Sequence, residues 1–221
     1  MIELRDLALD APDGRLQVEG LHLSVARGGN LLVAGPSGCG KSQLLKVIAG
    51  LERPARGRVQ VDGRDIWPGD GALGMAGRVR VGFAFASGGL LSNLSLRENV
   101  ALPLRFLGLS PSEIQARVGA ALDRLGLVAA AELRPHAVSA SGRKHANLAR
   151  ILALNPELIL LDEPLEGLDA ADRAIAQELI QTWAADSART VVIAAEEAAF
   201  FSHLEAQRLQ LSGAPLSLES P

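Results

Sequence analysis

Hydrophobic and polar residues alternate along two stretches near the start of the chain, residues 2–9 and 15–25. A two-residue period is typical of strands with one buried face, and Pro12-Asp13-Gly14 between them is a turn signal. Strand signals return over residues 57–66 and 79–85. The first third of the sequence is therefore predicted to be rich in antiparallel β-structure.

Other strand signals are apolar throughout. Residues 158–161 and 191–194 are continuous apolar runs, as expected of parallel strands that are buried on both faces. A similar run at 31–34 precedes a glycine-rich turn and a helical pattern that ends before Gly50. Between the two later runs, an amphipathic helix is predicted from Ile175, Leu179 and Trp183. These units predict an α/β core with a parallel sheet.

The middle of the chain is predicted to be helical, from Ser95 to about Leu154. Ser95 with Glu98, and Ser110 with Glu113, have the spacing of a capping box at the start of a helix. One face of the second helix is apolar, through Ile114, Val118, Leu122 and Leu125. The fold class predicted is α/β, with an antiparallel β subdomain in front and a helical subdomain inserted in the core.

Composition and charge narrow the function classes. The 221 residues are 48% hydrophobic and 21% charged, which suits one globular domain. The net charge of −3 and the lack of a basic cluster argue against a nucleic-acid partner. Cys39 is the single cysteine, so no internal disulfide forms and a reducing compartment is expected. With no signal core and no long apolar run, we expect a cytoplasmic protein that meets membranes only peripherally.

The strongest motif is Gly35-Pro36-Ser37-Gly38-Cys39-Gly40-Lys41-Ser42, which fits G-x-x-x-x-G-K-[ST] between a strand and a helix. Glycines allow backbone N–H groups to surround phosphate oxygens, and the helix N-terminus adds positive potential. Lys41 is expected to reach the β- and γ-phosphates, and the Ser42 hydroxyl to ligate Mg²⁺. The fold predicted for the core is therefore a P-loop NTPase of the RecA-like kind.

A second motif ends the strand at 158–161 with Asp162 and Glu163. Ligands of open α/β sheets bind at this carboxyl edge. We expect Asp162 to hold Mg²⁺, and Glu163 to act as the general base on the attacking water.

Together with these two motifs, the chain resembles the ATP-binding subunits of ABC transporters over nearly its whole length. Gly167-Leu168-Asp169 looks like the D-loop of that family, and residues 138–142 stand where the family has its LSGGQ signature, with Ser139 lying 23 residues before Asp162. A weaker resemblance is to the ATPases of lipid-trafficking (Mla/MCE-type) importers.

The resemblance implies a dimer, in which each ATP lies between the phosphate loop of one chain and the signature of the other, which contains Ser139. Asp169 is also expected to bind the nucleotide. The dimer could be a homodimer or a heterodimer. Docking to membrane subunits is implied near residues 86–104, and this places the protein on the inner face of the membrane. One ABC-type domain is expected over 1–221, with its core at 1–86 and 157–213, a helical subdomain at about 87–156 and a tail at 214–221.

Several positions depart from the family pattern. Ala86 replaces the glutamine that senses Mg²⁺, and Glu196 replaces the switch histidine. Ala140 and Ser141 replace the two signature glycines, and Ala11 stands about where an aromatic residue should stack on adenine. Turnover is therefore expected to be slow. The alternative is a catalytically impaired regulatory subunit that binds nucleotide beside an intact ATPase partner.

The residues after the signature are expected to be solvated. Arg143, Lys144 and His145 form a charged run at the start of the predicted signature helix. Such a run usually faces water.

Overall fold

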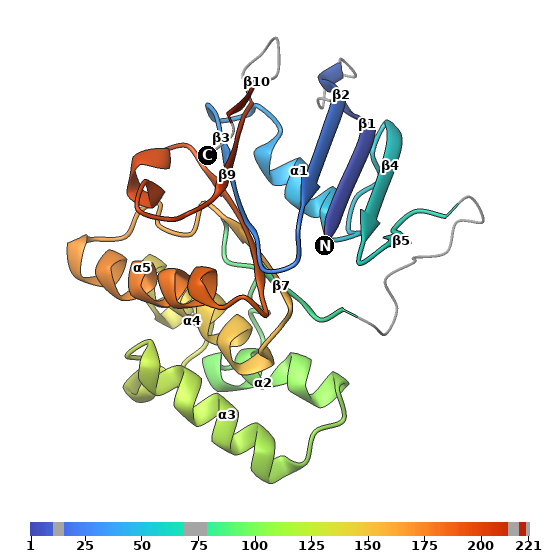
Figure 1. The fold of residues 1–221 in the computed structure, drawn as a ribbon. Helices are drawn as coiled ribbons and strands as arrows, with labels where there is room; N and C mark the ends of the chain where they lie inside the picture. The colour runs from blue at the N-terminus through green and yellow to red at the C-terminus, as the bar shows by residue number, and fades with distance from the viewer. Residues whose placement is uncertain (11–15, 69–78, 212–216, 220–221) are drawn as a thin grey trace.

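Two sheets form the upper part of the structure, a computed structural model that describes residues 1–10, 16–68, 79–211 and 217–219 (Figure 1). The first sheet is antiparallel and has the order β2-β1-β4-β5. Its strands are β1 (Ile2–Asp10), β2 (Leu16–Val25), β4 (Arg56–Val61) and β5 (Arg64–Asp65). The predicted strand at 57–66 is thus split in two by a turn at Asp62 and Gly63, where both residues have positive φ angles.

The second sheet has the order β10-β9-β3-β8-β7-β6, and its strands pair in parallel except β10 with β9. They are β3 (Asn30–Ala34), β6 (Val81–Ala84), β7 (Leu158–Asp162), β8 (Thr190–Ala195), β9 (Gln207–Gln210) and β10 (Ser217–Glu219). Helix α1 (Lys41–Ile48) lies between the two sheets and contacts β7 and β8 on one side and β1 and β4 on the other (Figure 1).

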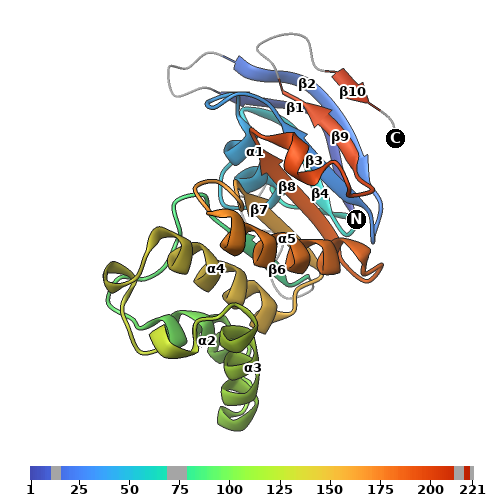
Figure 2. The ribbon, with the colours of Figure 1, turned by 90° about the vertical axis from the view of Figure 1, so that its left-hand side faces the viewer.

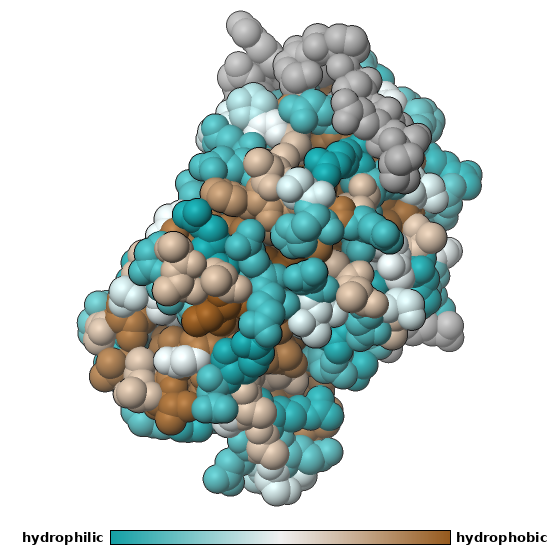
Figure 3. Space-filling model, turned by 60° about the vertical axis from the view of Figure 1, so that its left-hand side comes forward, coloured by the Kyte–Doolittle hydropathy of each residue, from teal (hydrophilic) through white to brown (hydrophobic). Residues whose placement is uncertain are grey.

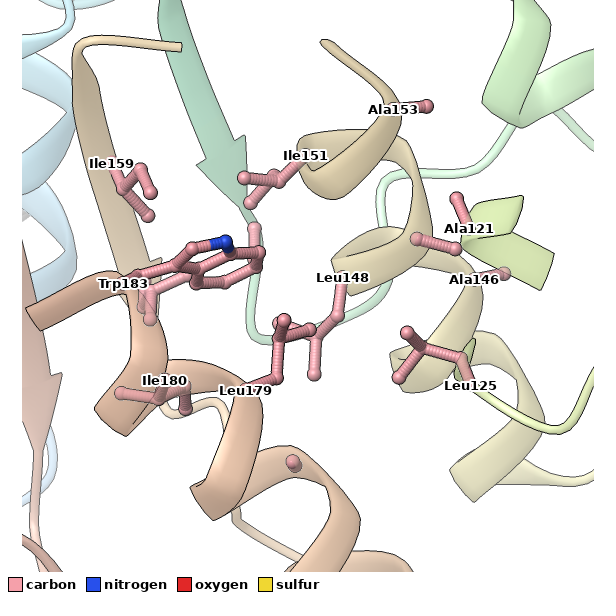
Figure 4. Packing of buried hydrophobic residues seen from close by; sticks show 14 of the residues in the cluster. Ala121, Leu125, Ala146, Leu148, Ile151, Ala153, Ile159, Leu179, Ile180 and Trp183 are labelled. Carbon is pink, nitrogen blue, oxygen red and sulfur yellow. The ribbon is translucent and has the colours of Figure 1, made fainter. Parts of the chain in front are cut away.

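The core has two parts because the central strands are buried on both faces. Along β7, Leu158 and Leu160 pack with α1 and the antiparallel sheet, whereas Ile159 and Leu161 pack toward the helices. Figure 4 shows Ile159 beside Trp183 of α5 (Ala170–Ala185) and Ile151 of α4 (Ala140–Leu154). The alternation explains why the sequence pattern of this strand is continuously apolar.

Helices α2 (Leu96–Phe106), α3 (Pro111–Arg124) and α4 make up the lower part of the molecule (Figure 2). Both predicted capping boxes are present, at the N-termini of α2 and α3. The remaining segments are short 3-10 helices: η1 (Val128–Ala130), η2 (Pro135–Ala137) and η3 (Ala198–Phe201). The α/β fold class is confirmed, with an antiparallel sheet, a mainly parallel sheet and a helical part between β6 and β7; the exact domain boundaries stay a prediction.

In the part of the chain that the structure describes, no helix combines the length and the apolar character that a membrane span requires. The turn at Pro12-Asp13-Gly14, the position of Ala11 and most of the tail at 214–221 lie outside the described residues.

Candidate nucleotide-binding site

The predicted phosphate loop connects β3 to the N-terminus of α1. Gly35 has a φ of 153°, and a methyl group on its Cα would lie 2.2 Å from the backbone oxygen of Leu211 and 2.6 Å from Cys39 Sγ. Only glycine fits there. Gly40 is the N-cap of α1 in a left-handed conformation, without a side-chain cap. The N–H groups of the first turn therefore have no intrahelical or capping partner, which suits an anion.

Lys41 is buried at the start of α1, with 5% of its surface exposed. Its Nζ donates to the backbone oxygens of Gly35 at 2.8 Å and Pro36 at 3.1 Å, and lies 3.2 Å from Glu163 Oε1. These three oxygens match the three donors of an ammonium group. The lysine is thus held inside the loop, at the point where a phosphate oxygen would meet it.

The Ser42 hydroxyl and the Asp162 carboxylate lie together although 120 residues separate them, because Ser42 Oγ donates to Asp162 Oδ1 at 2.9 Å. Burial raises the pKa of Asp162, while the Ser42 hydroxyl, the Ala86 backbone N–H and two nearby lysines oppose the shift. A buried carboxylate beside a hydroxyl is a set of hard oxygen donors, which fits Mg²⁺. The predicted Mg²⁺ ligands are therefore adjacent.

Glu163 follows β7 and is one of the few non-glycine residues of the described chain with a positive φ, 44°. Its Oε1 faces Lys41, and its Oε2 accepts the backbone N–H of Glu196 at 3.1 Å. A left-handed backbone at this position is costly for a residue with a Cβ, and such strain often accompanies function. The turn directs the carboxylate toward the phosphate loop.

The register of the parallel sheet explains why Glu196 and Glu163 are neighbours. Asp162 of β7 pairs with Ala194 of β8, so the residues that follow each strand meet at the same sheet edge. Ala86 follows β6 in the same way and directs its backbone N–H to Asp162. Two of the positions that depart from the family pattern, Ala86 and Glu196, therefore lie at this edge of the sheet.

A cavity of about 690 Å³ lies beside the phosphate loop. It is lined by Ser37, Gly38, Gly40, Lys41, Ser42, Ala86, Glu163 and Glu196, together with residues that the sequence motifs did not identify: Asp10, Gln17, Gln43, Lys46, Glu52, Arg53 and Glu166. Gln17, from β2, donates its side-chain N–H to the backbone oxygen of Gly38. Arg53 stacks over the ring of Trp67, with its guanidinium carbon 5.0 Å from the ring centroid. Gln17 and Arg53 belong to no sequence motif, and only the packing of the fold brings them to the phosphate loop.

Ser139 and Asp169 do not line this cavity. Instead they are N-cap residues. Ser139 Oγ accepts the N–H of Gly142 at the start of α4, and Asp169 Oδ1 accepts the N–H of Asp172 at the start of α5. Gly35, Pro36 and Cys39 also do not line it, although they belong to the loop, and neither does Asp162. The Cys39 thiol is free and packs against the core.

The prediction that Arg143, Lys144 and His145 face water is wrong. His145 is buried between the backbone oxygens of Leu125 and Asp172, each 3.2 Å from a ring nitrogen. Arg143 Nη1 donates to the backbone oxygen of Val138 at 2.7 Å, and Lys144 reaches Glu163. The long polar side chains of this run contact backbone oxygens of neighbouring segments instead of water. A sequence pattern does not reveal these contacts, because their partners are distant in the chain or depend on how the segments pack.

The comparison with family models identifies the chain. Residues 18–166 match the model described as ABC transporter, and this segment covers most of the site. The chain belongs to the ABC transporter family. The predicted family, with its P-loop fold, is thereby confirmed.

Individual ABC transporter proteins support the assignment. The taurine import ATP-binding protein TauB of Pseudomonas aeruginosa is 42% identical over 160 residues, which are 72% of this chain and 58% of TauB. The lipoprotein-releasing system ATP-binding protein LolD of Chromohalobacter salexigens is 33% identical over 195 residues, which are 88% of this chain and 82% of LolD. The chain thus spans less than two thirds of TauB.

A solved structure gives the same result. A dimeric ATP-binding cassette in a post-hydrolysis state, bound to ADP and Pi, superimposes with a TM-score of 0.88 at 26% identity, over 99% of this chain and 98% of that one. The fold is therefore that of an ABC ATP-binding cassette. ATP is the nucleotide that the relatives' names and this neighbour support.

Proposed function

We propose that this chain is an ATP-binding subunit of an ABC transporter, which hydrolyses Mg-ATP slowly and couples hydrolysis to transport by membrane subunits. The observation that carries the proposal is that Lys41, Ser42 and Glu163 line one cavity beside the phosphate loop, with Asp162 hydrogen-bonded to Ser42. Every group that phosphoryl transfer to water minimally requires is within that arrangement.

Each of these residues has a role that its contacts suit. The N–H groups at the start of α1 and the Lys41 ammonium neutralise phosphate oxygens, with Lys41 leaving its backbone oxygens for them. Ser42 and Asp162 hold Mg²⁺, which draws charge from the phosphates when bound. Glu163 accepts a proton from the attacking water, since its carboxylate faces the loop and lies beside Lys41.

Glu196 limits the rate. It lines the cavity on the side of Glu163, where a second carboxylate repels the triphosphate instead of donating a hydrogen bond to it. Ala86 supplies no side-chain donor or acceptor either. The loss of one preorganised contact to the transition state typically costs about 10²–10³ in rate.

A second cassette completes the site. Ser139 and Asp169 belong to this chain but lie away from its own cavity, so they can contact nucleotide only across an interface. A dimer in which each chain presents these residues to its partner's phosphate loop accounts for both motifs. An intact ABC ATPase as partner would supply a better signature than Ala140 and Ser141 do.

The membrane subunits bind on the helical part, near residues 86–104 and the end of α2. Phe106 is 85% exposed, and Leu91 and Leu107 are also exposed, which leaves large apolar side chains on this part of the surface. Figure 3 shows hydrophobic residues gathered over the lower part of one face. Exposed apolar side chains are typical of a protein interface, and membrane subunits bound there would hold the chain at the inner face of the membrane, in the cytoplasm.

Steady-state Mg-ATP turnover of the purified chain tests the proposal, with Glu163→Gln as the blank. Glutamine keeps the size of the side chain but accepts no proton, so the native chain should exceed the blank by about tenfold or more. Turnover equal to the blank would refute hydrolysis by the chain alone.

The second candidate function is a regulatory subunit that binds nucleotide and hardly hydrolyses it; Glu196 and Ala86 favour it. Equilibrium binding of Mg-ATP separates the two candidates: binding by the purified chain with no turnover above the blank supports the regulatory subunit. Turnover above the blank excludes it.

A further inference from the structure

The side chain of Lys144 crosses from α4 to the end of β7. Its Nζ donates to the backbone oxygen of Glu163 at 2.6 Å and lies 3.9 Å from Glu166 Oε2. Only 15% of the side chain is exposed. A cation of the helical part is therefore placed against the backbone of the proposed general base.

The backbone of Glu163 needs such a contact because its conformation is unfavourable. Its φ of 44° is in the left-handed region, and its N–H donates to the Ala194 oxygen at 2.9 Å. The carboxylate is held by Lys41 and by the Glu196 N–H. The Glu163 carbonyl is the remaining polar group of the residue; it accepts the backbone N–H of Glu166 at 3.3 Å and, more closely, the Lys144 ammonium at 2.6 Å.

The surroundings of Lys144 make this placement specific. Burial lowers the pKa of the lysine, and the carboxylates of Glu166, Glu163 and Asp162 oppose that shift. Removing an ammonium from water is costly unless hydrogen bonds and opposite charges replace the water. The carbonyl of Glu163 supplies the hydrogen bond and the three carboxylates supply the opposite charge. The ammonium group can therefore stay charged in this partly buried position.

The same helix also holds the loop that follows Ala86. Asn147 donates to the backbone oxygen of Gly88, and Arg150 Nη1 donates to the oxygen of Gly89 at 2.9 Å. Lys144, Asn147 and Arg150 are spaced three residues apart, so they project from one side of α4. Helix α4 thus contacts both the turn after β7, which carries Glu163, and the loop after β6, which carries Ala86.

We propose that Lys144 is a positioning residue for ATP hydrolysis, which holds the backbone of Glu163 in the conformation that directs its carboxylate to the phosphate loop and makes that conformation depend on the position of α4. The inference rests on the proposed function, because it concerns the general base of that reaction. Lys144 itself touches neither nucleotide nor water in the reaction; it acts through Glu163.

Two substitutions and one control test the role. Lys144→Met removes the ammonium but keeps the apolar stem, and Lys144→Arg keeps a cationic donor. The control is Arg124→Met, which removes an ion pair from α3 to Glu178 of α5 at 2.9 Å, away from the cavity.

We expect Lys144→Met to lower kcat by about 10–100-fold, because a small displacement of a catalytic group has that effect, with KM and the Kd of Mg-ATP within about threefold of native. Lys144→Arg should restore most of kcat, and Arg124→Met should match the native chain. An unchanged kcat in Lys144→Met, or an equal loss in Arg124→Met, would overturn the role.

Hydrogen exchange of the peptide spanning residues 159–168 gives a readout that does not depend on turnover. In Lys144→Met the amides of this peptide should exchange roughly tenfold faster, because a bond to a charged donor is lost, and in Arg124→Met they should not. Unchanged exchange overturns the positioning role even if kcat falls. If the native chain has no turnover above Glu163→Gln, hydrolysis itself fails, and the exchange result alone decides whether Lys144 holds this turn.

Discussion

Asn99 provides the sharpest prediction about stability, because its buried side chain holds the segment that leads into α2. Its Oδ1 accepts the N–H of Leu91 at 2.7 Å, and its Nδ2 is 2.9–3.2 Å from the backbone oxygens of Leu91, Leu94 and Ser95. The side chain is fully buried. Asn99→Ala removes all these bonds at once.

The expected cost follows from which groups can find other partners. A hydrogen bond contributes about 1 kcal/mol net, and the two N–H groups of Nδ2 are shared among three oxygens, so a set of about three full bonds contributes about 3 kcal/mol. Ser95 keeps the backbone N–H of Asn99 as a donor at 2.9 Å, and Leu91 is half-exposed, so water recovers part of the loss. We therefore expect Asn99→Ala to lower the free energy of unfolding by about 2–3 kcal/mol.

Urea unfolding measures this loss, with fluorescence of the buried Trp183 as the signal and an unchanged slope as the check on two-state behaviour. Asn93→Ala is the matched control, because Asn93 is exposed and no described residue bonds its side chain. It should stay within about 0.5 kcal/mol of native. An Asn99→Ala protein as stable as the Asn93→Ala protein would refute the argument that these bonds order the segment.

Three further predictions follow from the site and the sheet edge. Gly35→Ala should weaken Mg-ATP binding by about tenfold or more in a calorimetric titration, because the new methyl group would lie 2.2 Å from a backbone oxygen; Gly119→Ala, with open space around it, should bind normally. Asp162→Asn should raise the Mg²⁺ concentration for half-maximal turnover by at least about tenfold, and an unchanged value would exclude this carboxylate as a ligand. Burial acts to raise the pKa of Glu157, but the backbone N–H and guanidinium of Arg80 overcome it and hold the pKa below the ordinary value of 4.5. The ionised carboxylate therefore stabilises the fold at pH values above its unfolded pKa, and this effect is lost as the pH falls through its folded pKa. Glu157→Gln should lower the free energy of unfolding at neutral pH and leave it equal to native in acid. Urea unfolding at a series of pH values measures the difference, and a difference that does not change with pH would contradict this.

The phosphate loop and the strand that ends in Asp162 could be predicted from the sequence because each is a local feature. A strand, a glycine-rich turn and a helix start follow one another within residues 31–48, and their residue types are set by backbone geometry and hydrogen bonding over a few positions. The capping boxes of α2 and α3 are local in the same sense, and the structure has them where they were predicted.

The tertiary structure decided which distant residues share the site. Ser42 and Asp162 meet because α1 packs on β7, and Glu196 meets Glu163 because β7 and β8 pair in register. The sequence motifs predicted the first meeting, because Ser42 and Asp162 were both expected to hold Mg²⁺ at the carboxyl edge of the sheet. Gln17, by contrast, carries no motif, and only the position of the antiparallel sheet over the loop brings it there.

Lys144 is the plainest case of what the sequence by itself leaves open. In the chain it is one member of a charged run, and such runs usually face water. In the fold, the turn after β7 has an unfavourable backbone, and α4 passes close enough for Lys144 to donate to the carbonyl of that turn. The sequence determined the strands, the helices and the phosphate loop through local periodicity and turn chemistry. Burial and strand register, which arise only when distant segments pack, decided which charged side chain lies against Glu163, the proposed general base.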